Sequence, residues 1–279
     1  SITNAAYYSE AELESMVSMK NSLSAELNIL RNSLFETALE VVAHNLNHKN
    51  NSLRLFEFGK AYSTSGPGKY SETEQLCILL SGNTREDEWK QKAVPADLYV
   101  LKGTVESVFR GLGIRPDAIE RVDVPKLDNH IIYKINNQVI AGAGMVSKAM
   151  LEKFGIKQPV YYAGINWELI SELAVAHSPK IREISKYPAV QRDLAMIVPK
   201  ELAWQEVEKT VQKIRLDNLR DIKLFDIFES DKLKKNKKSL AVNFTFLDEE
   251  KTLTDKEIDG WMNKIMGTLE KELQAEIRK

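Results

Sequence analysis

The order of apolar patterns after residue 192 constrains the fold more than any other feature of the chain. Strand-like patterns are predicted at residues 193–198, 222–228, 240–247 and 275–278. Between them, residues 201–215 form a helix with Val207, Val211 and Ile214 on one face. Thr254 and Glu257 have the spacing of a capping box, which begins a second helix. The order β-α-β-β-α-β is the ferredoxin-like split βαβ arrangement, and it serves many functions, so function must be argued from a site.

The preceding residues predict a mixed domain whose strands are antiparallel and carry packed helices. Helices are expected at residues 33–48, 97–112 and 149–154, and strands at 53–58, 76–81, 131–135, 138–141 and 160–167. Asn136 and Asn137 tolerate positive φ and predict a tight hairpin, whereas residues 63–68 have the composition of a loop. The fold class is therefore α+β.

A polar run containing Pro179, His177–Lys180, is the expected linker, because proline keeps the residue before it out of helical geometry. We therefore predict domains at residues 1–178 and 183–279. A chain of 279 residues suits two domains. The missing initial Met indicates an excised fragment.

Composition excludes several classes of protein. No apolar run approaches the roughly 20 residues that span a bilayer, and the N-terminus has no signal peptide. The single cysteine, Cys77, lies in an apolar run typical of a buried strand and suits a reducing cytosol. The net charge is −1, so no global basic excess indicates nucleic-acid binding. We expect a cytoplasmic protein with no membrane partner.

Motifs along residues 185–255 carry a resemblance. Ser185–Ala195 (SKYPAVQRDLA), Leu224–Phe228 (LFDIF), Lys237–Ala241 (KKSLA) and Lys251–Asp255 (KTLTD) stand in this order. They resemble the ferredoxin-fold anticodon-binding domain of bacterial phenylalanyl-tRNA synthetase β subunits. This resemblance covers nearly all of the predicted second domain.

The first domain resembles the catalytic-like module of the same subunit more loosely. The matching residues are Asn21–Ser33, Leu55–Gly59 (LFEFG) and Leu101–Glu106 (LKGTVE). That module has the class II synthetase fold, an antiparallel sheet with flanking helices, and does not activate amino acid. Ser147 and Lys148 stand where the family usually has a His-Pro pair. The family's upstream editing domains are not in this sequence.

The resemblance implies four anticodon contacts, and strand chemistry supports two of them. The contacts are Ala195, Asp226, Phe228 and Ser239. Alternation along a strand puts Asp226 and Phe228 on one face and Ile227 on the other, where we expect it to enter the core. The carboxylate accepts hydrogen bonds from guanine, the first anticodon base for phenylalanine, and the ring stacks on it. The family often has Tyr at position 228, and Phe keeps the stacking plane.

A lysine-rich stretch lies between the second and third strands of the second domain. It contains Lys232, Lys234, Lys235, Lys237 and Lys238. Such a run is usually a solvated turn, and next to an anticodon site it would contact phosphates without sequence preference. Residues 183–279 carry 19 basic and 19 acidic side chains, so we expect a shallow salt dependence of RNA binding.

The family also implies partners: tRNA(Phe) and an α subunit, in an α2β2 heterotetramer. The complete ligase uses ATP and Mg²⁺, and we expect no cofactor, metal or catalytic residue in this fragment. His44 and His48 have the spacing of a zinc pair, but the sequence shows no third ligand.

Two alternatives remain open at this point. A stand-alone class II enzyme would need arginines for ATP, for which Arg31 and Arg54 are the candidates. Alternatively, the chain is a stand-alone RNA-binding or metabolite-binding regulatory module, because ferredoxin-like domains have both uses.

Overall fold

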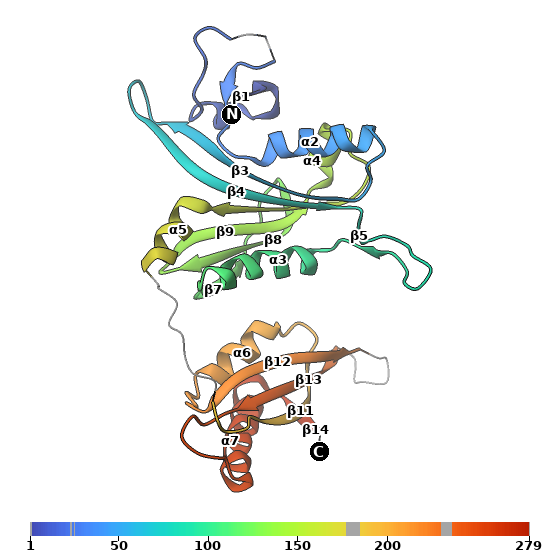
Figure 1. Ribbon diagram of the computed structural model, residues 1–279, viewed down its shortest axis with the longest axis vertical. Coiled ribbons are helices and arrows are strands. Elements are labelled where there is room, and N and C mark those ends of the chain that lie inside the picture. Colours follow the sequence, from blue (N-terminus) through green and yellow to red (C-terminus); the bar gives the residue numbers. More distant parts are fainter. Residues whose placement is uncertain (1, 23, 25, 177–184, 230–235, 279) are drawn as a thin grey trace. The chain divides into compact units, whose positions relative to one another are not determined.

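The computed structural model describes residues 2–22, 24, 26–176, 185–229 and 236–278. The chain divides into two compact units, Ser1–Lys180 and Ile181–Lys279 (Figure 1). The predicted linker, residues 177–180, lies outside the described residues. No helix within these described ranges has both the length and the apolar content to cross a membrane.

The first unit is built on a six-stranded antiparallel sheet. Its order is β3 (Leu53–Thr64), β4 (Tyr70–Ser81), β10 (Val160–Asn166), β9 (Gln138–Val146), β8 (Leu127–Ile135) and β7 (Ala118–Arg121). A separate pair, β5 (Asn83–Arg85) and β6 (Val94–Pro95), follows β4 in the chain.

Helices cover both faces of this sheet. Cys77 and Leu79 of β4 pack in one core with α2 (Phe35–Asn47) and α4 (Lys148–Lys153). Leu76, Ile78 and Leu80 pack in another core with α3 (Leu98–Gly111) and α5 (Trp167–Ala176). Burial on both faces explains why the middle of β4 is a continuous apolar run rather than an alternating one.

A short N-terminal segment adds a small core of its own. It contains β1 (Ile2–Thr3), the 3₁₀ turn η1 (Ala5–Tyr7), α1 (Glu10–Leu13) and β2 (Ile29–Leu30). Tyr8, Met16 and Ile29 are its buried residues. Backbone hydrogen bonds from Tyr62 to Arg31 and from Thr64 to Ser15 fasten this segment to the end of β3.

Local signals predicted several elements well. Helix α3 begins after Asp97, whose side chain accepts a hydrogen bond from the Val100 amide. Asn136 and Asn137 have φ of 48° and 66°, which confirms the tight hairpin between β8 and β9. The loop predicted at residues 63–68 is shorter, because β3 runs to Thr64.

Trp167 was expected at the end of a strand and instead begins helix α5. The Leu169 amide donates a hydrogen bond to Asn166 Oδ1. Asn166 therefore has the bonding of a helix N-cap, which turns the chain from β10 directly into a helix.

The second unit has the ferredoxin-like order predicted from its sequence. Its antiparallel sheet runs β12 (Leu219–Phe228), β13 (Lys237–Phe246), β11 (Val190–Pro199) and β14 (Glu276–Arg278). Helices α6 (Trp204–Gln212) and α7 (Asp255–Leu273) share one core with the sheet. The capping box of Thr254 and Glu257 at the start of α7 is confirmed. The other face of the sheet carries polar and half-exposed side chains.

Candidate nucleic-acid interface

The open face of the second sheet brings the four predicted contact residues together. Leu194 and Met196 of β11 and Val242 of β13 point into the core, so the intervening residues face away from the helices. In one row across the sheet, Ala195 pairs with Ala241, which pairs with Asp226. In the next row, Ser239 pairs with Phe228. All four predicted positions therefore lie in two adjacent rows of one face.

These positions differ in how far they reach the solvent. Ser239 is 8% exposed and Ala195 is half-buried, so both lie in the floor of the sheet. Asp226 is exposed on the edge strand, and Phe228 beside it is 54% exposed. In the described part of the chain, the Asp226 carboxylate has no hydrogen bond or ion pair. An acidic group and an aromatic plane are thus both open to a ligand.

A β-bulge in β12 enlarges this surface. Leu224 pairs with Val242 and Asp226 pairs with Ala241, which leaves Phe225 as the extra residue. Since Leu224 packs toward the core, Phe225 faces the open side, and the bulge keeps Asp226 there as well. Phe225 is 53% exposed. Sequence reasoning missed Phe225 as a site residue, because alternation without a bulge assigns Phe225 and Asp226 to opposite faces.

Ile227 corrects the sequence prediction. Its pairing with Leu240 places it on the helix side, as expected, but it does not enter the core, because 53% of it is exposed. The core of this unit includes Ile222 and Leu224 of the same strand and ends before Ile227. The reason is its position near the end of an edge strand, beyond the packed core.

Polar side chains in the middle of the open face bind one another. Asn243 Nδ2 donates to Asp193 Oδ1 at 2.6 Å. Thr245 Oγ1 donates to Asn243 Oδ1 at 3.3 Å. These contacts fix the centre of the face, whereas Asp226 remains available at its edge.

The structure describes two of the five predicted phosphate-contact lysines. Lys237 forms an ion pair with Glu276 of β14, so part of its charge is already balanced. Lys238 pairs in register with Val198, a core residue, and therefore lies on the helix side of the sheet. Lys232, Lys234 and Lys235 lie outside the described residues.

In the first unit, the Arg31 side chain is buried and bonds to neighbouring residues. It is 5% exposed, and its Nη2 lies 2.8 Å from Glu57 Oε1. Its Nε donates to the Lys60 carbonyl at 3.1 Å, and its Nη1 donates to Thr37 Oγ1 at 3.2 Å. These bonds join the segment before α2 to β3, which does not fit the ATP contact that a stand-alone enzyme needs. Arg54 is exposed on β3.

The two histidines discounted as a zinc pair contact each other at the C-terminal end of α2. The ring centroids of His44 and His48 are 4.3 Å apart, and His48 Nδ1 lies 2.8 Å from the His44 carbonyl oxygen. Across the described ranges, no three His, Cys, Asp or Glu side chains come together as a metal site.

Comparison with known proteins gives both units a family. Residues 1–167 match the family model described as the phenylalanyl tRNA synthetase beta chain CLM domain. Residues 185–278 match the ferredoxin-fold anticodon binding domain. A pyrrolysyl tRNA synthetase structure from Desulfitobacterium hafniense aligns with 16% identity and a TM-score of 0.48, over 63% of this chain and 58% of that one.

Curated relatives match along the whole sequence. The phenylalanine–tRNA ligase beta subunit of Bacteroides fragilis is 35% identical over 295 residues, covering 100% of this chain and 36% of the relative. The corresponding subunit of Streptococcus pneumoniae is 32% identical over 261 residues, covering 92% of this chain and 32% of the relative. The chain thus spans about a third of the length of these relatives. With family models matching residues 1–167 and 185–278, the chain belongs to the phenylalanyl-tRNA synthetase β-chain family.

Proposed function

We propose that this chain is part of a phenylalanine–tRNA ligase and that its second unit binds the anticodon of tRNA(Phe). The observation that carries the proposal is the exposed pair of Asp226 and Phe228 on the open face of the sheet. Membership in the β-chain family and the match to an anticodon-binding fold support it. Specific RNA recognition usually targets single-stranded bases, which an anticodon loop presents.

The chemistry of this pair fits guanine. The Asp226 carboxylate has no partner within the described residues and accepts hydrogen bonds from the guanine N1–H and N2–H₂ groups. The ring of Phe228 stacks on the base, which is worth about 1–3 kcal/mol. Phe225, on the same face, provides a second aromatic surface for a neighbouring base.

The partner and the reaction form the second part of the proposal. The first unit packs against an α subunit in a cytoplasmic α2β2 heterotetramer, and the ATP- and Mg²⁺-dependent chemistry takes place on α. The relatives' names as beta subunits support a partner. Large exposed side chains also support an interface: Phe56 is 71% exposed, Tyr99 83% and Trp89 91%. Arg31, held by internal bonds, supports a role without catalysis.

The test is tRNA binding by the complete enzyme with the substitution Asp226→Asn. Asparagine keeps one acceptor oxygen, but its NH₂ group faces a guanine N–H donor, so one of the two hydrogen bonds is lost. A mismatch of this kind is worth about 1–3 kcal/mol, so affinity for tRNA(Phe) should fall about 5- to 150-fold. Asp221→Asn is the matched control, since this carboxylate lies on the same strand about 17 Å away. Equal affinity of the unmodified enzyme for tRNA(Phe) and for a variant with guanine 34 replaced would defeat the anticodon assignment.

A further inference from the structure

A second candidate binding site lies in the first unit. It is a pocket of about 810 Å³ between the N-terminal segment, α2, α4 and the chain before β8. Its walls are largely aromatic and apolar, with contributions from Tyr7, Tyr8, Phe35, Met150 and Tyr162. Pockets for small molecules have volumes of about 300–1,000 Å³ and similar walls with a few polar groups.

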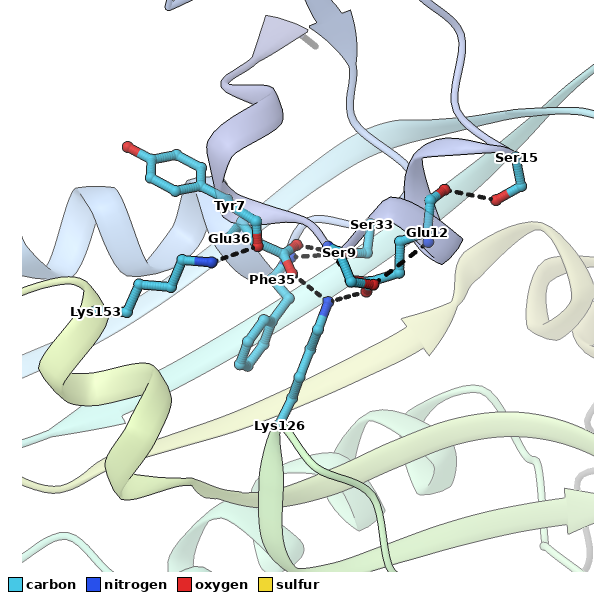
Figure 2. Close-up of polar contacts among 9 residues, drawn as sticks. All are labelled: Tyr7, Ser9, Glu12, Ser15, Ser33, Phe35, Glu36, Lys126 and Lys153. Carbon is cyan, nitrogen blue, oxygen red and sulfur yellow. Dashed lines mark hydrogen bonds and ion pairs between the residues drawn. The ribbon is translucent and has the colours of Figure 1, made fainter.

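A charged network borders this pocket, with Ser9, Glu12, Ser33 and Lys126 in its lining and Glu36 buried behind them (Figure 2). Lys126 Nζ donates to Glu36 Oε1 at 2.6 Å and also to Glu12 Oε1. Ser33 Oγ donates to the other oxygen of Glu36 at 2.9 Å. The Ser9 amide and hydroxyl donate to the other oxygen of Glu12 at 2.9 and 2.8 Å. All four carboxylate oxygens therefore already accept hydrogen bonds.

Electrostatics keep Glu12 and Lys126 ionised. Burial raises the pKa of Glu12, but hydrogen bonds from Lys126 and Ser9 outweigh that effect and lower the pKa to about 2. The pKa of Lys126 is raised: burial lowers it, and the hydrogen bonds to Glu12 and Glu36 outweigh the burial. The carboxylates thus hold Lys126 in place.

Among the described residues that line this pocket, the two lysines and the Tyr8 hydroxyl keep unused hydrogen-bonding capacity. Lys153 of α4 donates from Nζ to the Tyr7 carbonyl at 2.9 Å, and an ammonium group has three N–H donors. Lys126 uses two of its donors on Glu12 and Glu36. Figure 2 shows both ammonium groups pointing toward the segment that carries Tyr7 and Ser9. The pocket therefore offers a ligand N–H donors beside aromatic walls.

We propose that this pocket binds a small aromatic carboxylate. The ring of the ligand lies among the aromatic side chains, and its carboxylate accepts hydrogen bonds from Lys153 and Lys126. The site belongs to the first unit, and the proposal does not depend on the function proposed for the second unit.

The experiment is calorimetric titration of the full chain with two probes that share a ring and differ in charge, 3-phenylpropionate and phenethylamine. A ligand of this size binds with a Kd of about 1 mM. We expect saturable binding of 3-phenylpropionate near that value, and binding of phenethylamine at least tenfold weaker.

The variants Lys153→Gln and Lys148→Gln separate the site from nonspecific binding. Lys153→Gln should lower the affinity for 3-phenylpropionate at least tenfold. Lys148 lies on the same helix, its side chain is 89% exposed and it pairs with Glu152, so Lys148→Gln should leave affinity unchanged. Absence of saturable binding, equal affinity for both probes, or equal affinity of both variants would overturn the proposal.

Discussion

Replacing Lys126 by Met tests how the first unit tolerates a buried charge. The Glu36 side chain has an exposed fraction of 0%, and Lys126 is its ion-pair partner at 2.6 Å. Methionine keeps much of the length of the lysine side chain and removes its charge. The variant therefore leaves the Glu36 carboxylate with the hydrogen bond from Ser33 and, among the described residues, no compensating cation. Removing one partner of a buried ion pair typically costs about 3–5 kcal/mol.

Proton uptake limits this loss and gives it a pH signature. An unfolded glutamate has a pKa of about 4.3, so neutralising the carboxyl at pH 7 costs about 3.7 kcal/mol. The share of the destabilisation that comes from Glu36 should not exceed that value at pH 7, and at pH 5 it should fall to about 1 kcal/mol. Loss of the Lys126–Glu12 bond adds a cost that is the same at both pH values, because Glu12 is ionised at both. The lowered pKa of Glu12 stabilises the native state above about pH 4.5, and this contribution is lost as the pH falls toward 2. The free energy of unfolding of the unsubstituted protein should therefore change little between pH 7 and 5.

The assay is urea unfolding of the full chain at both pH values, with hydrogen exchange of α2 amides reporting on the first unit alone. Lys148→Met is the control, because an exposed i,i+4 pair with Glu152 is worth about 0.3–0.5 kcal/mol. The double variant Lys126→Met with Glu36→Gln should recover most of the loss. A cost below about 1 kcal/mol at pH 7, or one independent of pH, would refute the reasoning.

Three further outcomes are expected. Phe228→Ala should weaken tRNA(Phe) binding by the complete enzyme about 5- to 150-fold in filter binding, whereas Phe228→Tyr keeps the stacking plane and the affinity. Asn137→Val should lower the free energy of unfolding by about 1–3 kcal/mol, since φ is 66° there, and Asn137→Gly should change it little in the same urea titration. Burial raises the pKa of the Cys77 thiol to about 11, so at pH 8 iodoacetamide should add mass only after unfolding; labelling of the native protein at the same rate would contradict this burial.

Much of the second unit was predictable because its signals are local. Thr254 and Glu257 are three residues apart, and the capping box they predict forms at the start of α7. The alternation of Asp226 and Phe228 depends only on strand geometry, and the structure places both on one face. The same holds for Asn136 in the first unit, whose positive φ comes from the turn itself.

Features that arise from distant contacts could not be predicted. The bulge at Phe225 depends on how β12 pairs with β13. The exposure of Ile227 depends on where the core ends. Glu36 has a local partner in Ser33, three residues earlier, whose hydroxyl donates to it. Its second bond, however, is with Lys126, 90 residues later in the chain, and no local pattern indicates such a pairing.

The surroundings of Arg31 show how its guanidinium is held inside the first unit. A Cβ atom at Gly59 would lie 2.2 Å from Arg31 Nη2, so the missing side chain makes the room that the guanidinium occupies. There Arg31 pairs with Glu57 and bonds to the Lys60 carbonyl, both on β3. An arginine that binds ATP must direct its N–H groups at a phosphate, and the bonds to Glu57, Lys60 and Thr37 turn them inward instead. The same contacts join the segment before α2 to β3, the edge strand of the sheet.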